Sequence, residues 1–133
     1  MGLLRRRRLP EELVGAYDRF LAVVEVVESA KEELLAAVPG PRTPGVPLAE
    51  ALFAFSASLQ QATEAMPAWR VPALEERWLA CERGIAQASS QADRLRTEAP
   101  ELGFEALLGV IGDILAPLEE FEGALDRFME LRR

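Results

Sequence analysis

The stretch FEALLGVIGDILAPLEEFEGALDRF, residues 104–128, decides the fold class. Its apolar residues recur at alternating spacings of three and four over the whole stretch: Phe104, Leu107, Ile111, Ile114, Leu118, Phe121, Leu125 and Phe128. This spacing places side chains on one face of an α-helix. Because Pro117 lacks a backbone N–H in the middle of the stretch, we expect one helix with a kink near residues 113–117.

The same rhythm occurs in three earlier stretches, which proline-containing segments separate. Their apolar positions are Leu13, Tyr17, Phe20, Val24, Val27, Leu34 and Val38; Leu48, Leu52, Phe55, Leu59, Ala62 and Met66; and Val71, Leu74, Trp78, Cys81, Ile85, Ala88, Ala92, Leu95 and Ala99. Pro10, followed by Glu11 and Glu12, suits the first turn of the first helix. Since no segment alternates with period two, the sequence predicts an all-α protein.

Four such helices with short connections predict an antiparallel up-and-down four-helix bundle. The second helix, at about 19 residues or about 28 Å, is shorter than the others. We expect the proline-rich linker VPGPRTPGVP, residues 38–47, to lie along the bundle end that this short helix leaves uncovered. We assign residues 1–9 to a disordered basic tail and residues 10–133 to a single helical-bundle domain.

Both tryptophans of the chain lie in AMPAWRVPALEERW, residues 65–78. Pro67 ends the second helix and Pro72 begins the third, so this stretch is a tight corner. Trp78 falls on the core stripe of the third helix. The favoured interpretation is that Trp69, in the turn itself, caps the bundle end; the alternative makes it an exposed recognition residue.

A helical wheel places several apolar side chains away from the predicted core. Phe53, Leu79 and Val26 lie about 140°, 135° and 125° from the centres of their stripes. If Val26 and Phe53 lie on neighbouring helices, they form one patch that suits a homodimer or a helical partner. The predicted interaction surface therefore consists of Phe53, Val26 and Leu79, with Trp69 added in its exposed alternative.

Small residues predict where the third and fourth helices approach closely. Counted from the turn between these helices, Ala88 and Ala92 come level with Gly109 and Gly112, and small side chains at matching heights permit close packing. The alternative is a pocket near residues 89–90 that holds a small apolar ligand between the helices.

The net charge of −7 is concentrated on the first and last predicted helices. Residues 10–38 hold seven acids and two bases, and residues 100–133 hold eight acids and three bases, so each stretch carries −5. An acidic body argues against nucleic-acid binding by the domain. The cluster Arg5–Arg8 is interpreted as a solubilising tail; its alternatives are a weak attraction to anionic lipid or nucleic acid and a strap against the acidic helices.

The composition excludes several kinds of catalytic site. The chain has no histidine and one cysteine, which rules out histidine triads, cysteine–histidine dyads, imidazole-bound metals and an internal disulfide. The remaining candidates are two ExxE pairs, Glu25 with Glu28 and Glu119 with Glu122. Only Glu28 and Glu122 flank the core on the wheel, so they are the candidate metal ligands, and a solvated acidic face is the favoured interpretation.

The sequence thus predicts a non-enzymatic, cytoplasmic helical bundle that binds no cofactor and acts by protein–protein interaction, as a homodimer or an adaptor. Its arginine-rich composition, with Lys31 as the only lysine, is typical of a GC-rich bacterial genome. Two alternatives stay open. One is a carboxylate-dependent divalent-metal hydrolase of the all-α nucleotide pyrophosphohydrolase type, and the other is a binder of small apolar ligands.

Overall fold

The computed structural model describes residues 8–37, 48–98 and 104–132, and every regular element in them is helical. The α-helices are α1 (Glu11–Ala36), α2 (Leu48–Ala65), α3 (Glu75–Glu98), α4 (Phe104–Leu115) and α5 (Glu120–Glu130), with α4 and α5 forming one continuous helical region. The all-α prediction with four helical regions is therefore confirmed. The predicted linker, most of the basic tail, Val38 and Ala99 lie outside the described residues.

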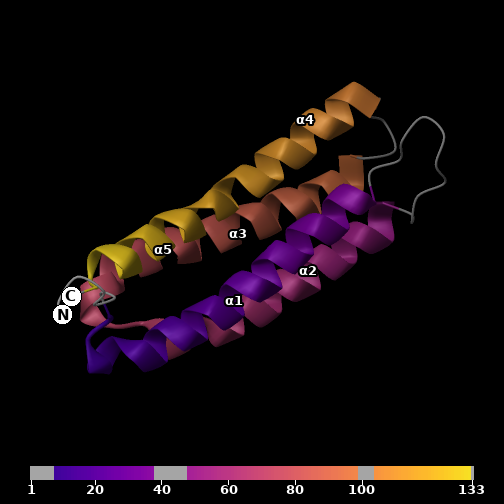
Figure 1. Cartoon of the computed structure of the whole chain (residues 1–133). Coiled ribbons are helices and arrows are strands. Elements are labelled where there is room, and N and C mark those ends of the chain that lie inside the picture. The colour runs from indigo at the N-terminus through magenta and orange to yellow at the C-terminus, as the bar shows by residue number, and fades with distance from the viewer. Residues whose placement is uncertain (1–7, 38–47, 99–103, 133) are drawn as a thin grey trace.

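The helical regions lie side by side around one hydrophobic core (Figure 1). Helix α1 packs closely on α2, α2 on α3, and α3 on the region from α4 to α5. The first residues of α1 and the last residues of α5 lie at the same end of the molecule (Figure 1). Helix α2 has 18 residues against 26 in α1 and 24 in α3, so the second helix is the short one, as predicted.

Prolines set the helix ends at the positions that the sequence indicates. Pro10 is the N-cap of α1, and Glu11 and Glu12 occupy its first turn, where carboxylates favour the positive end of the helix dipole. At the corner, two 3-10 turns, η2 (Met66–Trp69) and η3 (Pro72–Leu74), join α2 to α3.

Pro117 divides the last helical region. It lies in a 3-10 turn, η5 (Ala116–Glu119), between α4 and α5, because its nitrogen has no hydrogen to donate to the α-helical ladder. Gly84 of α3 is buried directly against this turn, and a Cβ added at Gly84 would collide with the carbonyl oxygen of Pro117. Gly84 is therefore a point at which the backbones of α3 and the last helical region come very close together.

The predicted close approach at Gly109 and Gly112 is wrong. Ala88 and Ala92 are fully buried, as expected, but both glycines are exposed, and a Cβ added at either would meet no atom within 4 Å. The count matched heights along the helices and not the sides on which residues lie: Gly109 and Gly112 follow the buried Leu107 and Ile111 by two residues and one residue, so they point away from the buried side of α4.

Most predicted stripe residues are buried in one core that draws on every helix. Five departures occur: four stripe residues are half-buried, and Leu125 is 36% exposed; the half-buried ones are Tyr17, Val24, Leu48 and Val71. In α1 the innermost positions are instead shifted by one residue, to Ala16 and Val23.

Candidate interaction surface

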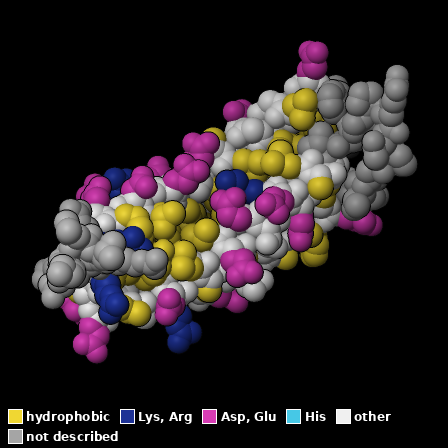
Figure 2. Space-filling model, in the orientation of Figure 1, with side chains coloured by type: hydrophobic (Ala, Val, Ile, Leu, Met, Phe, Trp, Pro, Cys, Tyr) yellow, Lys and Arg dark blue, Asp and Glu magenta, His cyan; other side chains and the backbone are white. Residues whose placement is uncertain are grey.

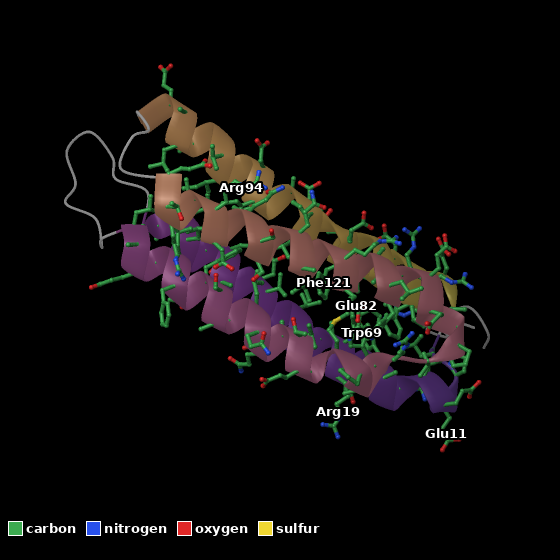
Figure 3. The ribbon with its side chains drawn as sticks, turned by 180° about the vertical axis from the view of Figure 1, so that it is seen from behind. Glu11, Arg19, Trp69, Glu82, Arg94 and Phe121 are labelled. Atoms are coloured by element: carbon green, nitrogen blue, oxygen red, sulfur yellow. The ribbon has the colours of Figure 1, made fainter. Side chains whose placement is uncertain are left out.

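The corner between α2 and α3 is an aromatic plug rather than a recognition loop. Trp69 is fully buried, its ring centroid lies 4.9 Å from that of Phe20, and its indole nitrogen donates to the sulfur of Met66 at 3.2 Å. Figure 3 shows Trp69 and Phe121 between the helices, whereas Glu11 and Arg19 point outward. Trp69 is therefore a capping residue, and its alternative place in an exposed surface is wrong.

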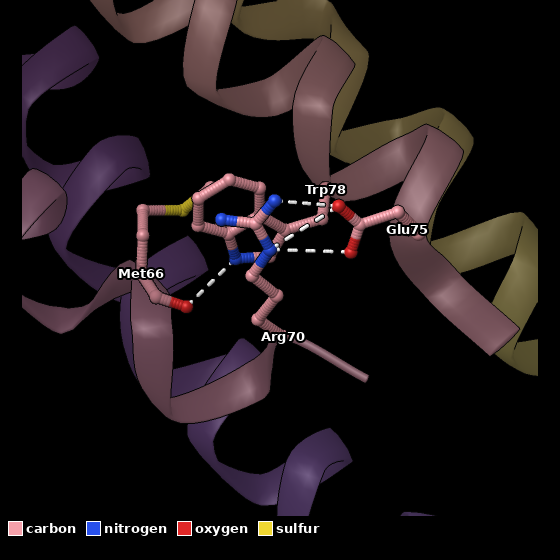
Figure 4. A network of polar contacts seen from close by, with 4 residues as sticks. All are labelled: Met66, Arg70, Glu75 and Trp78. Carbon is pink, nitrogen blue, oxygen red and sulfur yellow. Dashed lines mark hydrogen bonds and ion pairs between the residues drawn. The ribbon is translucent and has the colours of Figure 1, made fainter. Parts of the chain in front are cut away.

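Trp78 completes this plug and organises the polar groups outside it (Figure 4). Its Nε1 donates to the backbone carbonyl of Met66 at 2.8 Å, and the guanidinium of Arg70 lies 4.0 Å from the centroid of its ring. Arg70 also pairs with Glu75 at 2.6 Å. This charge-assisted hydrogen bond lowers the pKa of Glu75 and raises that of Arg70.

The three other residues of the predicted interaction surface have different surroundings. Phe53 is 67% exposed, and the guanidinium of Arg96 on α3 lies 5.9 Å from its ring centroid. Leu79 is just exposed, at 37%. Val26 is half-buried and packs against the core, so the expected exposed patch of Val26 with Phe53 does not form. The wheel failed at Val26 because α2 covers that side of α1.

A second apolar row runs along α1, one residue beyond the core row. Whereas Leu13, Phe20 and Leu34 are buried, Val14, Leu21 and Leu35 are 46%, 39% and 52% exposed. The row continues at two half-buried residues: Tyr17 follows Val14 by three positions, and Val24 follows Leu21 by three positions. Apolar residues at spacings of three and four also indicate an apolar helix face, so the sequence contains the signal for this row. The predicted core stripe includes Tyr17 and Val24 instead.

The row on α1 faces the last helical region. The ring centroids of Tyr17 on α1 and Phe128 on α5 are 5.2 Å apart. On α5, Gly123 faces the guanidinium of Arg77 on α3, and Leu125, two residues on, points about 160° away from that side. Leu125 also precedes Phe128, the ring that contacts Tyr17, by three residues, so it lies beside Phe128 on the side of α5 that faces away from Arg77.

Leu108 of α4 is a further exposed apolar residue of the last helical region. It follows the buried Leu107 by one residue, as Leu125 follows the buried Ala124, and it is 44% exposed. We name the whole surface the apolar strip. It consists of Val14, Tyr17, Leu21, Val24 and Leu35 on α1, Leu108 on α4 and Leu125 on α5.

Acidic side chains border the apolar strip on both sides. Figure 2 shows the face of α1 and α4–α5, on which hydrophobic side chains gather in two areas with charged side chains between and around them. The exposed acids next to the strip are Asp18, Glu25 and Glu32 on α1, Glu119 in η5, and Glu122 and Asp126 on α5. The surface is therefore apolar in two areas, with charged side chains between and around them (Figure 2).

The two candidate metal ligands lie on this same face. Glu28 and Glu122 are both exposed, and Glu28 pairs with Lys31 at 3.2 Å. Among the residues that the structure describes, no group of three or more aspartate, glutamate or cysteine side chains has the arrangement of a metal site. The charged group that lies next to Glu28 in the structure is thus Lys31, with which it forms an ion pair.

A groove of about 490 Å³ lies between α2 and α3. Met66, Trp78 and Ile85 form part of its apolar wall, and Ser89 and Ser90 belong to its lining. The sequence placed a pocket near these two serines, but at the uncovered end of the bundle. In the structure the groove extends from the serines toward the corner instead.

Cys81 has no exposed surface and no disulfide partner. Burial raises the pKa of its thiol to about 12, with a smaller contribution from the nearby Glu120. Its place on the core stripe, predicted from the sequence, is confirmed, and at neutral pH the thiol is protonated.

Comparison of the chain with protein-family models, curated proteins and solved structures gives no match. In the described residues, none of the helices is both long and apolar enough to cross a bilayer.

Proposed function

We propose that this protein is a non-enzymatic helical bundle that works by binding another protein chain through the apolar strip. One observation carries the proposal. Of the seven large hydrophobic side chains that are exposed in the described residues, five belong to the strip: Val14, Leu21, Leu35, Leu108 and Leu125. Apolar surface residues scattered singly are ordinary, whereas a gathering of them on one face is typical of an interaction site.

The proposal includes the topology and the compartment. We propose an antiparallel up-and-down bundle with a bend at Pro117, supported by the close packing of consecutive helices and by the 3-10 turn at that proline. We also propose a cytoplasmic location, since a single, buried, unpaired cysteine suits a reducing compartment.

The test is site-specific photo-crosslinking in the native host. A photoreactive amino acid replaces Leu21 in the strip or, as the control, Gln87 on an exposed part of α3. We expect discrete protein adducts from position 21 that are absent from position 87, and mass spectrometry then separates a second copy of this chain from another protein. Identical adducts from both positions, or none from position 21, would refute the proposal.

A second candidate function is supported by the groove between α2 and α3. Its apolar wall and its polar lining by Thr63, Glu82 and Ser89 suit a small apolar ligand that carries an amine. We propose testing it by thermal shift with a panel of small aromatic amines, benzylamine among them. Any stabilisation should disappear in Ser89→Trp, which fills the groove, and should persist in Leu21→Ala.

A further inference from the structure

We infer that the apolar strip binds a basic amphipathic helix of another protein. The inference rests on the proposed function and adds the chemistry of the partner. Three features of the strip support it: the spacing of its apolar residues, the charges along its edges, and a polar pair within it.

The spacing on α1 matches that of a helix–helix seam. Val14, Leu21 and Leu35 are separated by seven and fourteen residues, and Tyr17 and Val24 each follow a member of this row by three. These are the a and d positions of a heptad repeat, which present a continuous face to a second helix. At 1.5 Å per residue the row from Val14 to Leu35 is about 32 Å long, the length of a partner helix of about three heptads.

The charges at the edges select the partner. Asp18 and Glu25 directly follow Tyr17 and Val24, and so occupy the position at which coiled-coil helices form interhelical ion pairs. On the last helical region, the exposed Asp126 directly follows Leu125, and Glu119 in η5 is also exposed. A helix lying along the strip therefore meets carboxylates on both flanks, and arginine or lysine on its own flanks complements them.

A second copy of this chain is a poor occupant of the strip. Two strips facing each other would bring acidic edges onto acidic edges, and like charges across an interface oppose association. The charge pattern therefore favours a different, basic chain.

The polar pair indicates the register. The next a and d positions after Val24 are occupied by Glu28 and Lys31, which form an ion pair at 3.2 Å. The side chain of Lys31 is only 19% exposed. Polar side chains within an otherwise apolar seam fix the alignment of the two helices, because only one alignment satisfies them. The partner helix is accordingly expected to carry a polar residue opposite Lys31.

The experiment measures binding of designed peptides to the full chain by fluorescence anisotropy. The probe is a synthetic peptide of three heptads with leucine at a and d and arginine at e and g. Matched peptides carry glutamine or glutamate at e and g. We expect the arginine peptide to bind, the glutamine peptide to bind about tenfold more weakly, and the glutamate peptide to bind at least about a hundredfold more weakly.

Matched variants separate docking on the strip from attraction between net charges. Leu21→Asp and Phe53→Asp each place one new carboxylate on an exposed apolar position, but only Leu21 belongs to the strip. Attraction between net charges alone would make both variants bind the arginine peptide more tightly. We expect Leu21→Asp to weaken binding about tenfold or more, and Phe53→Asp to leave it within about twofold of wild type.

Several results would overturn the inference. These are equal binding of the arginine and glutamate peptides, equal effects of Leu21→Asp and Phe53→Asp, or tighter binding by Leu21→Asp. A gain of about tenfold on deleting residues 1–8 would also overturn it, since the chain's own arginine cluster would then be the occupant. A crosslinked partner that contacts position 21 without a basic helix would refute this inference and leave the proposed function intact, whereas absence of any crosslink would refute the proposed function.

Discussion

The contact between Gly84 and Pro117 gives the sharpest test of the packing. In Gly84→Ala the new methyl group must occupy the space of the Pro117 carbonyl oxygen. That oxygen belongs to the backbone of η5, so it cannot move aside by changing a rotamer, and α3 must separate from η5 instead. Overpacking of this kind costs about 1–3 kcal/mol, whereas alanine is favoured over glycine within a helix by about 1 kcal/mol.

Gly112→Ala is the matched control, because it makes the same substitution within α4, where the added Cβ meets no atom within 4 Å. The propensity gain is common to both variants, so the difference between their unfolding free energies isolates the steric cost, about 1–3 kcal/mol. We expect Gly112→Ala to be more stable than wild type and Gly84→Ala to be less stable.

The assay is urea unfolding followed by far-ultraviolet circular dichroism, with thermal melting as a check. For a chain of 133 residues, 1 kcal/mol corresponds to a change in Tm of about 3.6 °C. The reasoning is wrong if Gly84→Ala gains as much stability as Gly112→Ala. Such a result would mean that α3 and η5 can separate without loss, and that a glycine is not required at this point.

Three further predictions concern the corner and the buried thiol. Trp78→Phe should lower the free energy of unfolding by about 1–3 kcal/mol more than Trp69→Phe in urea titrations, because only Trp78 donates to a backbone carbonyl; equal losses would contradict this. In Arg70→Gln, an NMR titration should show the pKa of Glu75 returning toward its ordinary value of 4.5. A lowered pKa stabilises the fold at pH values above the unfolded-state pKa, and this stabilisation is lost as the pH falls, so wild type and variant should become equally stable in acid. An unchanged titration of Glu75 would refute the ion pair. Because the pKa of Cys81 is raised, wild type should lose stability relative to Cys81→Ala as the pH rises from about 9 to about 12. Alkylation of the thiol at pH 8 should require unfolding, and rapid alkylation of the native chain would show instead that the thiol is accessible.

The sequence predicted the elements better than their contacts. Alternating apolar spacings located all four helical regions and placed Trp78, Cys81 and Ile111 in the core, because such a face forms only when one side of a helix is buried. The small residues were harder to interpret. Gly112 and Gly84 are both glycines within a helix, yet only Gly84 lies against another backbone, and the spacing of one helix does not show which neighbour comes close to it.

The interaction surface was the least predictable part, for a related reason. A wheel finds residues opposite the core, and so it selected Phe53 and Val26. The apolar strip lies instead directly beside the core, where Tyr17 and Val24 are half-buried, and a wheel cannot separate such positions from buried ones. Which flank stays open depends on how far apart two helices lie, and that distance is set by residues on both.

The sizes of the core residues explain why the open flank is the one between α1 and α5. Where α3 meets η5, Gly84 lets the two backbones come into direct contact. Between α1 and α5 the contacts are made by rings: Phe20 lies 5.0 Å from Phe128 and 6.2 Å from Phe121, centroid to centroid. Rings of this size keep the two helices apart. The next side chains outward, Leu21 and Leu125, therefore do not cover the space between the helices, and they stay partly exposed. We therefore expect smaller side chains at Phe20 or Phe128 to let α1 and α5 approach each other and to reduce the exposure of Leu21 and Leu125.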